Sequence, residues 1–410
     1  MTVRLSSDWD GLCTSRLGVA HLTRMAFQGE NLRPLWHALM DKATDDKAGS
    51  GMAMDLSVIA QLLGDKTTGL AIQNDTLAFQ QLYRSPCAAR ARLRVLAFAA
   101  ATDIGGNTPL EFLLTDSDIE LVTFYVVPGM TLPDPMPDHD VAIVIAPDSP
   151  EILAVLETLA PAWPRPILNC PAALRALDRD RLCKLLSGIA GLDIPMTARL
   201  GRAQVQALAD GAQPVQQLLE DGCYPLIIRP TGSHAGVGLE KIEQPGALAD
   251  YLAQRSEAEF FISRFVNYAD AQGRFRKYRL VMVDGKAYAC HMAIAEEWKV
   301  WYLNADMALS VPNRLQEALF MQNFDSDFAA RHAAALREMT ARLGLDYVTV
   351  DCAESPSGDL LIFEADHTAI VHDMDPPSVY PYKAPQMRKI FQAVQAMFRR
   401  RAGLARASAA

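Results

Sequence analysis

The chain has 410 residues, 50% of them hydrophobic and 21% charged, an ordinary composition for a soluble protein of two or three domains. Its formal net charge of −9 leaves no basic excess to displace counterions, which argues against general nucleic-acid binding. The seven cysteines are scattered and form no CxxC pair, so neither a disulfide framework nor a zinc site is expected. The first residues lack an apolar signal core, and no apolar run approaches the roughly 18 residues of a membrane span, so we expect a cytoplasmic protein without membrane contact.

The first part of the chain, residues 15 to about 86, has the spacing of amphipathic helices. In "MDLSVIAQLLGD" (54–65) one apolar face is formed by Leu56, Ile59, Ala60 and Leu63, and Gly64 offers a stop. "DTLAFQQLYRS" (75–85) predicts another short helix. Paired helices are weakly similar to a tetratricopeptide unit, but no repeat of that period follows, which favours a helical cap on the next domain.

Strands alternate with helices from about residue 92. The apolar runs "LRVLAFAA" (93–100), "IELVTFYVV" (119–127) and "DVAIVIA" (140–146) are strands, "PEILAVLETLA" is a helix, and "RPILN" closes a parallel α/β sheet. Such sheets bind ligands beyond the carboxyl ends of their strands. The "DIGGNTP" turn (103–109) falls at such an end, so Asn107 and Thr108 either contact substrate or belong to a tight connection.

After a helix at 171–190, the pattern becomes antiparallel. Residues 224–294 contain five strand candidates joined by short loops, and "VDGK" has the glycine of a hairpin turn. A helix around 325–343 precedes the strand "DYVTVD", the turn "PSGD" and the strand "LLIFEAD", and a last helix covers about 385–401.

Two features carry chemistry. The glycine-rich loop "TGSHAGVG" (231–238) joins two strands, so it is neither a Walker A motif nor a dinucleotide fingerprint; it is a hairpin whose amides cover phosphate oxygens, or an empty hairpin tip. Three carboxylates, Asp351, Glu364 and Asp366, end two apolar strands. Glu364 and Asp366 share a face, a hairpin brings Asp351 beside them, and such hard oxygen ligands suit Mg²⁺ bound together with substrate phosphates.

A phosphate-covering hairpin followed by a carboxylate metal site resembles the ATP-grasp superfamily, and among its members the glutathione synthetases and ribosomal-protein glutamate ligases. Six segments resemble its motifs in the right order: "DRDRLCKLLSGIAGLDIPMT", "PLIIRP", "TGSHAGVG", "FFISRFV", "KYRLVMVDGK" and "VDCAESPSGDLLIFEAD". The implied fold is a mixed α+β and α/β one, with an N-terminal helical region (1–90), a pre-ATP-grasp α/β domain (91–178) and an ATP-grasp domain (179–402). Residues 224–266 would form its nucleotide-covering subdomain, and 403–410 a frayed tail.

The resemblance also implies roles for single residues. Arg229 would reach the α- and β-phosphates of ATP, and Arg181 or Lys184 would replace the first nucleotide-binding lysine. The loop residues over the phosphates would be Ser233, His234, Ala235 and Gly236. The backbone of Arg264, Phe265 and Val266 would meet the adenine, with the Arg264 side chain facing solvent. Arg279 and Lys299 would face the transferred phosphoryl group or the acyl substrate, and Asp351, Glu364 and Asp366 would hold Mg²⁺.

Some positions depart from the superfamily pattern. Arginine stands for lysine at 229, which keeps the charge and adds a bidentate fork, and Asp366 stands for asparagine, which keeps an oxygen ligand. The segment "HTAIVHDMDPPSVYPYKAP" (367–385) replaces a Pro-Gly loop and is unusually polar. Each of its side chains fits an ordinary surface role, but together they predict a substrate pocket that includes His367, His372, Tyr382 and Lys383.

The implied function is an ATP-dependent carboxylate–amine ligase that works through an acyl-phosphate, with ATP and Mg²⁺ as cofactors. Its partners would be a small-molecule or peptide carboxylate and an amine; because ligases of this superfamily are often dimers, a homodimer is also an expectation. The alternatives are an ATP-grasp kinase of small molecules and a non-catalytic nucleotide-binding protein acting through its N-terminal helices.

Overall fold

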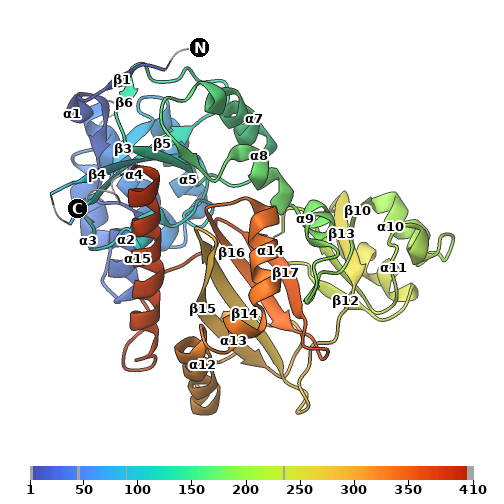
Figure 1. Ribbon diagram of the computed structural model, residues 1–410. Helices are drawn as coiled ribbons and strands as arrows, with labels where there is room; N and C mark the ends of the chain where they lie inside the picture. Colours follow the sequence, from blue (N-terminus) through green and yellow to red (C-terminus); the bar gives the residue numbers. More distant parts are fainter. Residues whose placement is uncertain (1–2, 44–46, 89, 234–235, 404–410) are drawn as a thin grey trace.

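The computed structural model describes residues 3–43, 47–88, 90–233 and 236–403. Its strands form three main sheets and one small pair, and its helices cover their faces (Figure 1). The mixed α/β class expected from the sequence is confirmed. No helix among the described residues combines the length and apolarity needed to span a membrane.

The first sheet lies in the N-terminal half. Its strands, in spatial order, are β2 (Thr14–Ser15), β3 (Leu82–Arg84), β5 (Ile119–Val126), β4 (Leu93–Ala100), β7 (Val141–Val144) and β8 (Ile167–Leu168). The expected parallel pairing is present, because β4 pairs in parallel with β5 and β7, and β7 with β8. These strands are mostly apolar, because both faces of the sheet are buried. A short pair, β1 (Leu5–Ser6) and β6 (Met136–Pro137), lies beside it.

The helix predicted at 75–85 is wrong from residue 78 onwards. Residues 75–77 are the last three residues of a helix that begins at Lys66, and the strand β3 starts at Leu82. The Gln80 side-chain oxygen accepts hydrogen bonds from the backbone N–H groups of Gln81 and Leu82, and Tyr83 is buried against β5. Aromatic and branched side chains at these positions therefore pair with a sheet instead of extending the helix. The region expected to be helical thus supplies two strands, β2 and β3, to the edge of this sheet.

The helices of this half surround the sheet. Their bounds are α1 (Trp9–Leu12), α2 (Val19–Phe27), α3 (Arg33–Met40), α4 (Lys47–Leu62), α5 (Lys66–Leu77), α6 (Leu110–Leu113), α7 (Pro150–Leu159) and α8 (Pro171–Leu174). The helix in "MDLSVIAQLLGD" is confirmed as the second half of α4, and Gly64 after it has a φ of +93°. The single helix expected at 171–190 is instead α8, a 3-10 turn and α9 (Arg179–Leu186).

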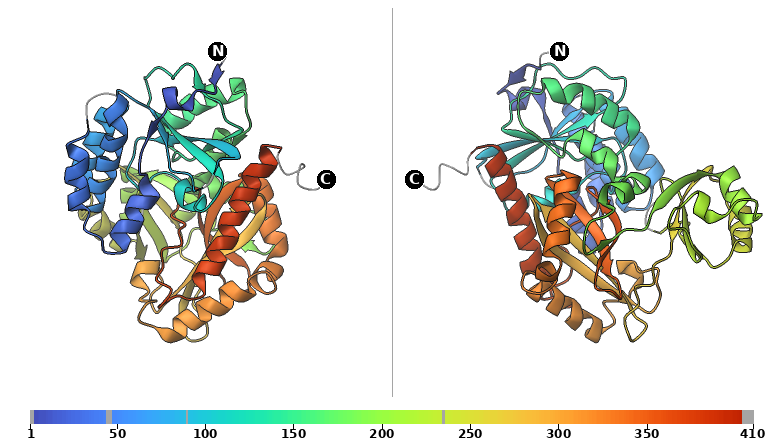
Figure 2. Two further views of the ribbon diagram at one scale, coloured as in Figure 1. Left: turned by 90° about the vertical axis from the view of Figure 1, so that its left-hand side faces the viewer. Right: turned by 45° about the vertical axis from the view of Figure 1, so that its right-hand side comes forward.

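The second half contains two antiparallel layers. A four-stranded sheet, β10 (Thr197–Gly201), β13 (Glu259–Arg264), β11 (Leu226–Pro230) and β12 (Glu240–Ile242), carries α10 (Arg202–Ala209) and α11 (Gly246–Ala253). This lobe projects to one side of the molecule (Figure 2). A five-stranded sheet has the order β15 (Lys286–Ala295), β14 (Phe275–Val283), β16 (Tyr347–Glu354), β17 (Leu360–Asp366) and β9 (Leu192–Asp193).

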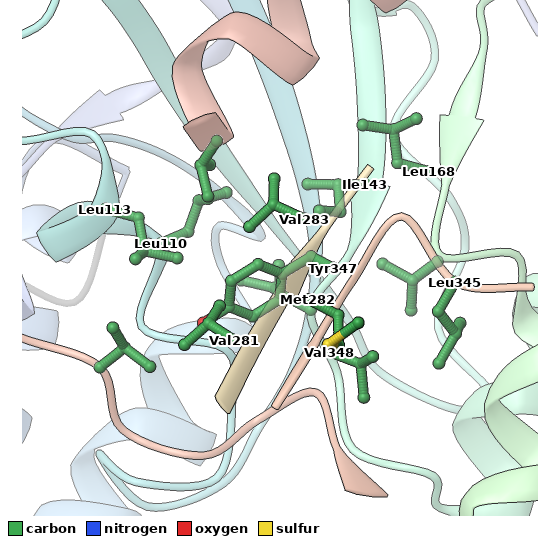
Figure 3. Close-up of a cluster of buried hydrophobic side chains, with 14 of the residues drawn as sticks. Leu110, Leu113, Ile143, Leu168, Val281, Met282, Val283, Leu345, Tyr347 and Val348 are labelled. Atoms are coloured by element: carbon green, nitrogen blue, oxygen red, sulfur yellow. The ribbon is translucent and has the colours of Figure 1, made fainter. Parts of the chain in front are cut away.

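The remaining helices pack on the five-stranded sheet. They are α12 (Val311–Asn323), which the sequence reading missed, α13 (Phe328–Arg331), α14 (Ala333–Leu343) and α15 (Lys383–Arg401). The hairpin turn at "VDGK" is confirmed, since Asp284 and Gly285 both have positive φ. One core joins this sheet to the α/β half: Figure 3 shows Leu110, Ile143 and Leu168 gathered with Val283 and Tyr347.

The end of β16 carries an acid-sensitive contact. Glu354 lies beside Arg331 and 2.9 Å from His332 Nε2. Burial opposes ionisation, but these two partners lower the pKa of Glu354 from 4.5 to about 2. A carboxyl group whose pKa is lower in the folded than in the unfolded protein stabilises the folded state at pH values above the unfolded-state pKa. This stabilisation is lost as the pH falls through the folded-state pKa.

We therefore expect the difference in unfolding free energy between wild type and Glu354→Gln to be constant above about pH 5 and to shrink as the pH falls from about 4.5 towards 2. Denaturant titrations across this pH range would measure it. Glu338→Gln, which removes an exposed helical partner of Arg342, is the matched control. A difference that grows in acid would contradict the assignment.

Candidate functional site

A cavity of about 1180 Å³ lies between the four-stranded and five-stranded sheets. Both sheets line it, together with α9, the turn at 102–106, residues 298–308 and the segment that follows β17. Nine of the predicted site residues line it: Arg229, Gly236, Arg264, Phe265, Val266, Arg279, Lys299, His372 and Lys383. The three predicted metal ligands, Asp351, Glu364 and Asp366, line it as well. Sequence segments more than a hundred residues apart therefore meet at one cavity.

Asp351 is held by two cations. It is 2% exposed and pairs with Glu364 across the β16–β17 ladder. Its carboxylate accepts hydrogen bonds from Arg279 Nε at 2.7 Å and Nη2 at 3.0 Å, and Lys277 Nζ lies 2.7 Å away. Burial alone would raise the pKa of Asp351, but Arg279 and Lys277 hold it well below its usual value. This carboxylate is therefore ionised and already neutralised by its own neighbours.

Glu364 and Asp366 point to the same side of β17, two residues apart. Glu364 pairs with Arg179, and that contact outweighs burial to lower the pKa of Glu364. Asp366 Oδ1 accepts hydrogen bonds from the backbone N–H and hydroxyl of Thr368, at 2.7 and 2.8 Å.

The arrangement of acids differs from the expected three-carboxylate site. Among the described residues, no group of three or more His, Cys, Asp or Glu side chains is placed to hold a metal ion. Mg²⁺ needs only one or two protein carboxylates when substrate phosphates supply further oxygens. Glu364, which pairs with one cation through Oε2, and Asp366 fit that requirement, whereas both oxygens of Asp351 are engaged by Arg279 and Lys277.

The glycine loop begins next to Arg229. The Arg229 Nε donates to Ser233 Oγ at 3.1 Å, and its Nη2 donates to the Ser233 carbonyl. Burial and the nearby Arg179 lower the pKa of Arg229 to about 10, so it remains a cation at neutral pH. Gly236 lines the cavity with a φ of +71°, whereas Ser233 does not line it. His234 and Ala235 lie outside the described residues.

Arg179 lies where Arg181 or Lys184 was expected. Arg181 and Lys184 are exposed and outside the lining, and Arg181 donates to the carbonyl of Arg175. Arg179 shares the inner face of α9 with Leu182, Cys183 and Leu186, at intervals of three, four and seven residues. That helical spacing is the sequence signal that would have selected it. Lys277 was also missed, although it is two residues from Arg279 and on the same face of β14.

The expected adenine-contacting segment lines the cavity, but the prediction for the Arg264 side chain is wrong. It is half-buried and does not face solvent freely, because its guanidinium donates to Asp193 and Asp221, each at 2.7 Å. Phe265 donates its backbone N–H to the Pro225 carbonyl at 2.8 Å. These contacts fix the end of β13 against the neighbouring loops.

Lys299 reaches across the cavity towards the glycine loop. Its Nζ donates to the Leu239 carbonyl at 2.8 Å, and a Cβ added at Gly236 would lie 3.3 Å from Lys299 Cε. The loop and the segment around 299 are therefore in close contact, and a side chain at Gly236 would crowd this lysine.

The predicted substrate residues divide into two groups. Asn107, Thr108 and His367 belong to a tight connection: Asn107 bonds both backbone groups of Ala100, Thr108 donates to the His367 carbonyl, and the His367 ring contacts the Ala146 carbonyl. Tyr382 lies outside the lining and donates to Glu317 at 2.6 Å. His372 and Lys383 line the cavity.

Lys383 lies in a buried cluster at the start of α15. Its Nζ contacts the Tyr302 hydroxyl, lies 3.1 Å from Asp375 and 3.6 Å from Glu317, and faces the rings of Tyr302 and Tyr380. Burial raises the pKa of Glu317. His291, which the sequence reading missed, also lines the cavity; its Nδ1 is buried without a hydrogen-bond partner among the described atoms, and burial keeps its pKa well below the usual value.

No protein-family model matches the chain, and no curated protein matches it. Among solved structures, it is similar to the VanG D-Ala:D-Ser ligase of Enterococcus faecalis, with 12% identity over 75% of this chain and 99% of that chain and a TM-score of 0.45. A RimK-domain ATP-grasp protein of Sphaerobacter thermophilus has 18% identity over 76% and 98%, with a TM-score of 0.42. The D-alanine–D-alanine ligase of Bacillus anthracis complexed with ATP has 14% identity over 76% and 98%, with a TM-score of 0.45.

Proposed function

We propose that the chain is an ATP-dependent carboxylate–amine ligase of the ATP-grasp superfamily. The observation that carries the proposal is that one cavity brings cations from several segments to two carboxylates on β17, of which Glu364 pairs with Arg179 and Asp366 accepts hydrogen bonds from Thr368. Five of the cations that line the cavity are central to the proposal. The cations are Arg179, Arg229, Lys277, Arg279 and Lys299, and the carboxylates are Glu364 and Asp366. Cations and metal-binding carboxylates facing one another suit a polyphosphate with its Mg²⁺.

The proposed reaction has two balanced steps. A substrate carboxylate oxygen attacks the γ-phosphorus of ATP, the bond from that phosphorus to the β–γ bridging oxygen breaks, and ADP leaves. A neutral amine then attacks the acyl carbon of the acyl-phosphate, inorganic phosphate leaves, and the amine proton passes to solvent or a nearby base. The product is an amide.

The chain's residues act by positioning and charge neutralisation. Arg229 and the backbone near Gly236 would bind phosphate oxygens, and the end of β13 would border the adenine. Arg279, oriented by both oxygens of Asp351, would face the transferring phosphoryl group together with Lys299. Glu364 and Asp366 would hold Mg²⁺, which supplies charge neutralisation between the phosphates. A small-molecule or peptide carboxylate and an amine are the proposed substrates, and the homodimer stays a prediction.

Hydroxylamine trapping tests this function. The full chain is incubated with ATP, Mg²⁺ and a panel of carboxylic acids, with hydroxylamine as the nucleophile. We expect acid-dependent release of ADP and an acyl hydroxamate detected by mass shift. A stable phosphoester without hydroxamate would identify the protein as a kinase. ATP binding without ADP release, whichever acid is added, would identify it as a non-catalytic nucleotide-binding protein.

Arg229 offers a graded test of phosphate binding. We expect Arg229→Ala to raise the KM for ATP by about tenfold to a hundredfold, because a charge-assisted hydrogen bond contributes about 1.5–3 kcal/mol. Arg229→Lys keeps the charge and should retain most of the turnover. Arg181→Ala, an exposed position on α9 outside the cavity, is the control. Near-wild-type ATP dependence in both Arg229 variants would show that the loop binds no phosphate.

A further inference from the structure

One part of the cavity is apolar and is formed by segments far apart in the sequence. It comprises Phe27 at the end of α2, Thr102, Gly105 and Gly106 of the 102–106 turn, and Ala369 and Ile370 after β17. We call this part the outer recess. The N-terminal helical region therefore contributes a wall of the same cavity that holds the cations and carboxylates.

The outer recess exposes apolar surface that nothing in the described chain covers. Phe27 is 53% exposed and Ile370 is 51% exposed, although both line the cavity. Its floor is open: a Cβ added at Gly105 would meet only Ile370 Cδ1, at 3.9 Å, an ordinary contact distance. Covering apolar surface of this kind with an apolar group of a ligand makes the free energy of binding more favourable.

The walls of the outer recess are fixed to each other. Arg24 of α2 pairs with Asp373 at 2.7 Å, donates to Thr115 at 3.1 Å and lies over the Phe112 ring at 5.2 Å. The His372 ring lies 6.4 Å from that of Phe27 and 6.3 Å from that of Phe112, measured between ring centroids. The recess is therefore preformed, which reduces the ordering cost of binding.

The charges near the outer recess exclude a carboxylate group as its occupant. None of the six residues that form the recess is a cation, and the cations beside it already have acidic partners: Arg24 pairs with Asp373, and Lys383 contacts Asp375 and Glu317. Asp103 of the same turn pairs with Lys66. The five cations of the proposed ATP site line other parts of the cavity, where ATP and the substrate carboxylate find counter-charges.

We propose that the outer recess binds the apolar side chain of the amine substrate, so that the enzyme selects amines with an aliphatic or aromatic side chain. This inference rests on the proposed ligase function. Phe27 and Ile370 are then specificity-determining residues, and Arg24 is a positioning residue that holds their two segments together.

Amino-acid amides test this selectivity because their blocked carboxyl groups let them act only as amines. With the acid that gives hydroxamate above, leucinamide, phenylalaninamide, serinamide and glycinamide replace hydroxylamine, and amide product is measured by mass spectrometry. We expect kcat/KM for leucinamide and phenylalaninamide to exceed that for glycinamide by at least tenfold, since even one methylene in a pocket is worth about 10-fold to 200-fold.

Two variants change the recess in opposite ways. Phe27→Ala should lower the leucinamide-to-glycinamide ratio about tenfold, and Gly105→Val should lower it by filling the floor. Phe79→Ala is the matched control, because Phe79 is 54% exposed in the same N-terminal region but lies outside the cavity. An unchanged ratio in Phe27→Ala and Gly105→Val, or a wild-type preference for serinamide or glycinamide, would overturn the inference.

The failure of the inference and the failure of the proposed function have different signatures. If hydroxamate forms but the enzyme does not discriminate among amines, only the inference about the outer recess is overturned. The same holds if the enzyme selects apolar side chains among the acids but not among the amines. Calorimetric titration of leucinamide and glycinamide into the full chain gives a readout that needs no turnover. Absence of hydroxamate with tighter leucinamide binding would overturn only the ligase, and equal binding of the two amides would overturn the recess.

Discussion

Replacement of Glu364 by glutamine is expected to reduce acid-dependent ADP release by at least about a hundredfold. In the proposed function Glu364 is one of two carboxylates that hold Mg²⁺, and its loss would remove a negative oxygen ligand from the site that neutralises the triphosphate. Arg179 would lose its partner at the same time. Initial rates of ADP release at saturating ATP, over a range of Mg²⁺ concentrations, would measure the effect.

A control separates this effect from a general loss of charge. Glu240→Gln removes an exposed carboxylate on β12, outside the cavity lining, and should leave the rate within about twofold of wild type. Partial recovery of Glu364→Gln at high Mg²⁺ would agree with metal binding. Wild-type rates in Glu364→Gln at all Mg²⁺ concentrations would remove this residue from the site.

The largest expected effect on stability is that of Asp351→Ala. This substitution leaves Arg279 and Lys277 in a mostly buried position without their shared carboxylate. Breaking such a buried pair by removing one partner costs about 3–5 kcal/mol, because the remaining charge is uncompensated. Denaturant-induced unfolding would show the midpoint shifted to lower denaturant concentration.

Two further variants make that result specific. Asp250→Ala changes an exposed aspartate on α11 and should alter the unfolding free energy by less than about 0.5 kcal/mol. Combining Asp351→Leu with Arg279→Met and Lys277→Leu removes all three charges and should recover much of the lost stability. An Asp351→Ala variant as stable as Asp250→Ala would show that the carboxylate does not neutralise its neighbours.

Much of the fold can be predicted because its signals are local. The strands at 93–100 and 360–366 are bounded as expected, since each contains a run of apolar residues of the length of a buried strand. The error at 75–85 arises because β3 depends on a tertiary partner: Leu82 and Tyr83 become a strand only beside β5. Local spacing at that position is equally compatible with a helix.

The site could be predicted in part for a similar reason. Motif order selected Arg229, Arg279 and Glu364, which line the cavity, whereas the choice between Arg179 and Arg181 depends on which face of α9 is turned inward. The neutralisation of Asp351 by two cations could not be predicted from the sequence, because its partner Lys277 belongs to no recognisable motif position. Phe27 and Ile370 are 343 positions apart in the chain, so only the folded structure brings them to one cavity.

The two short strands at the edge of the six-stranded sheet have a consequence for modularity. Because β2 pairs with β3 and β3 pairs with β5, removing the segment that carries them would leave the backbone donors and acceptors of β5 open to pairing with other chains. The same segment carries one wall of the cavity. The segment that carries β2, β3 and Phe27 is therefore structurally continuous with the α/β sheet and with the cavity, and we expect its removal to disrupt both.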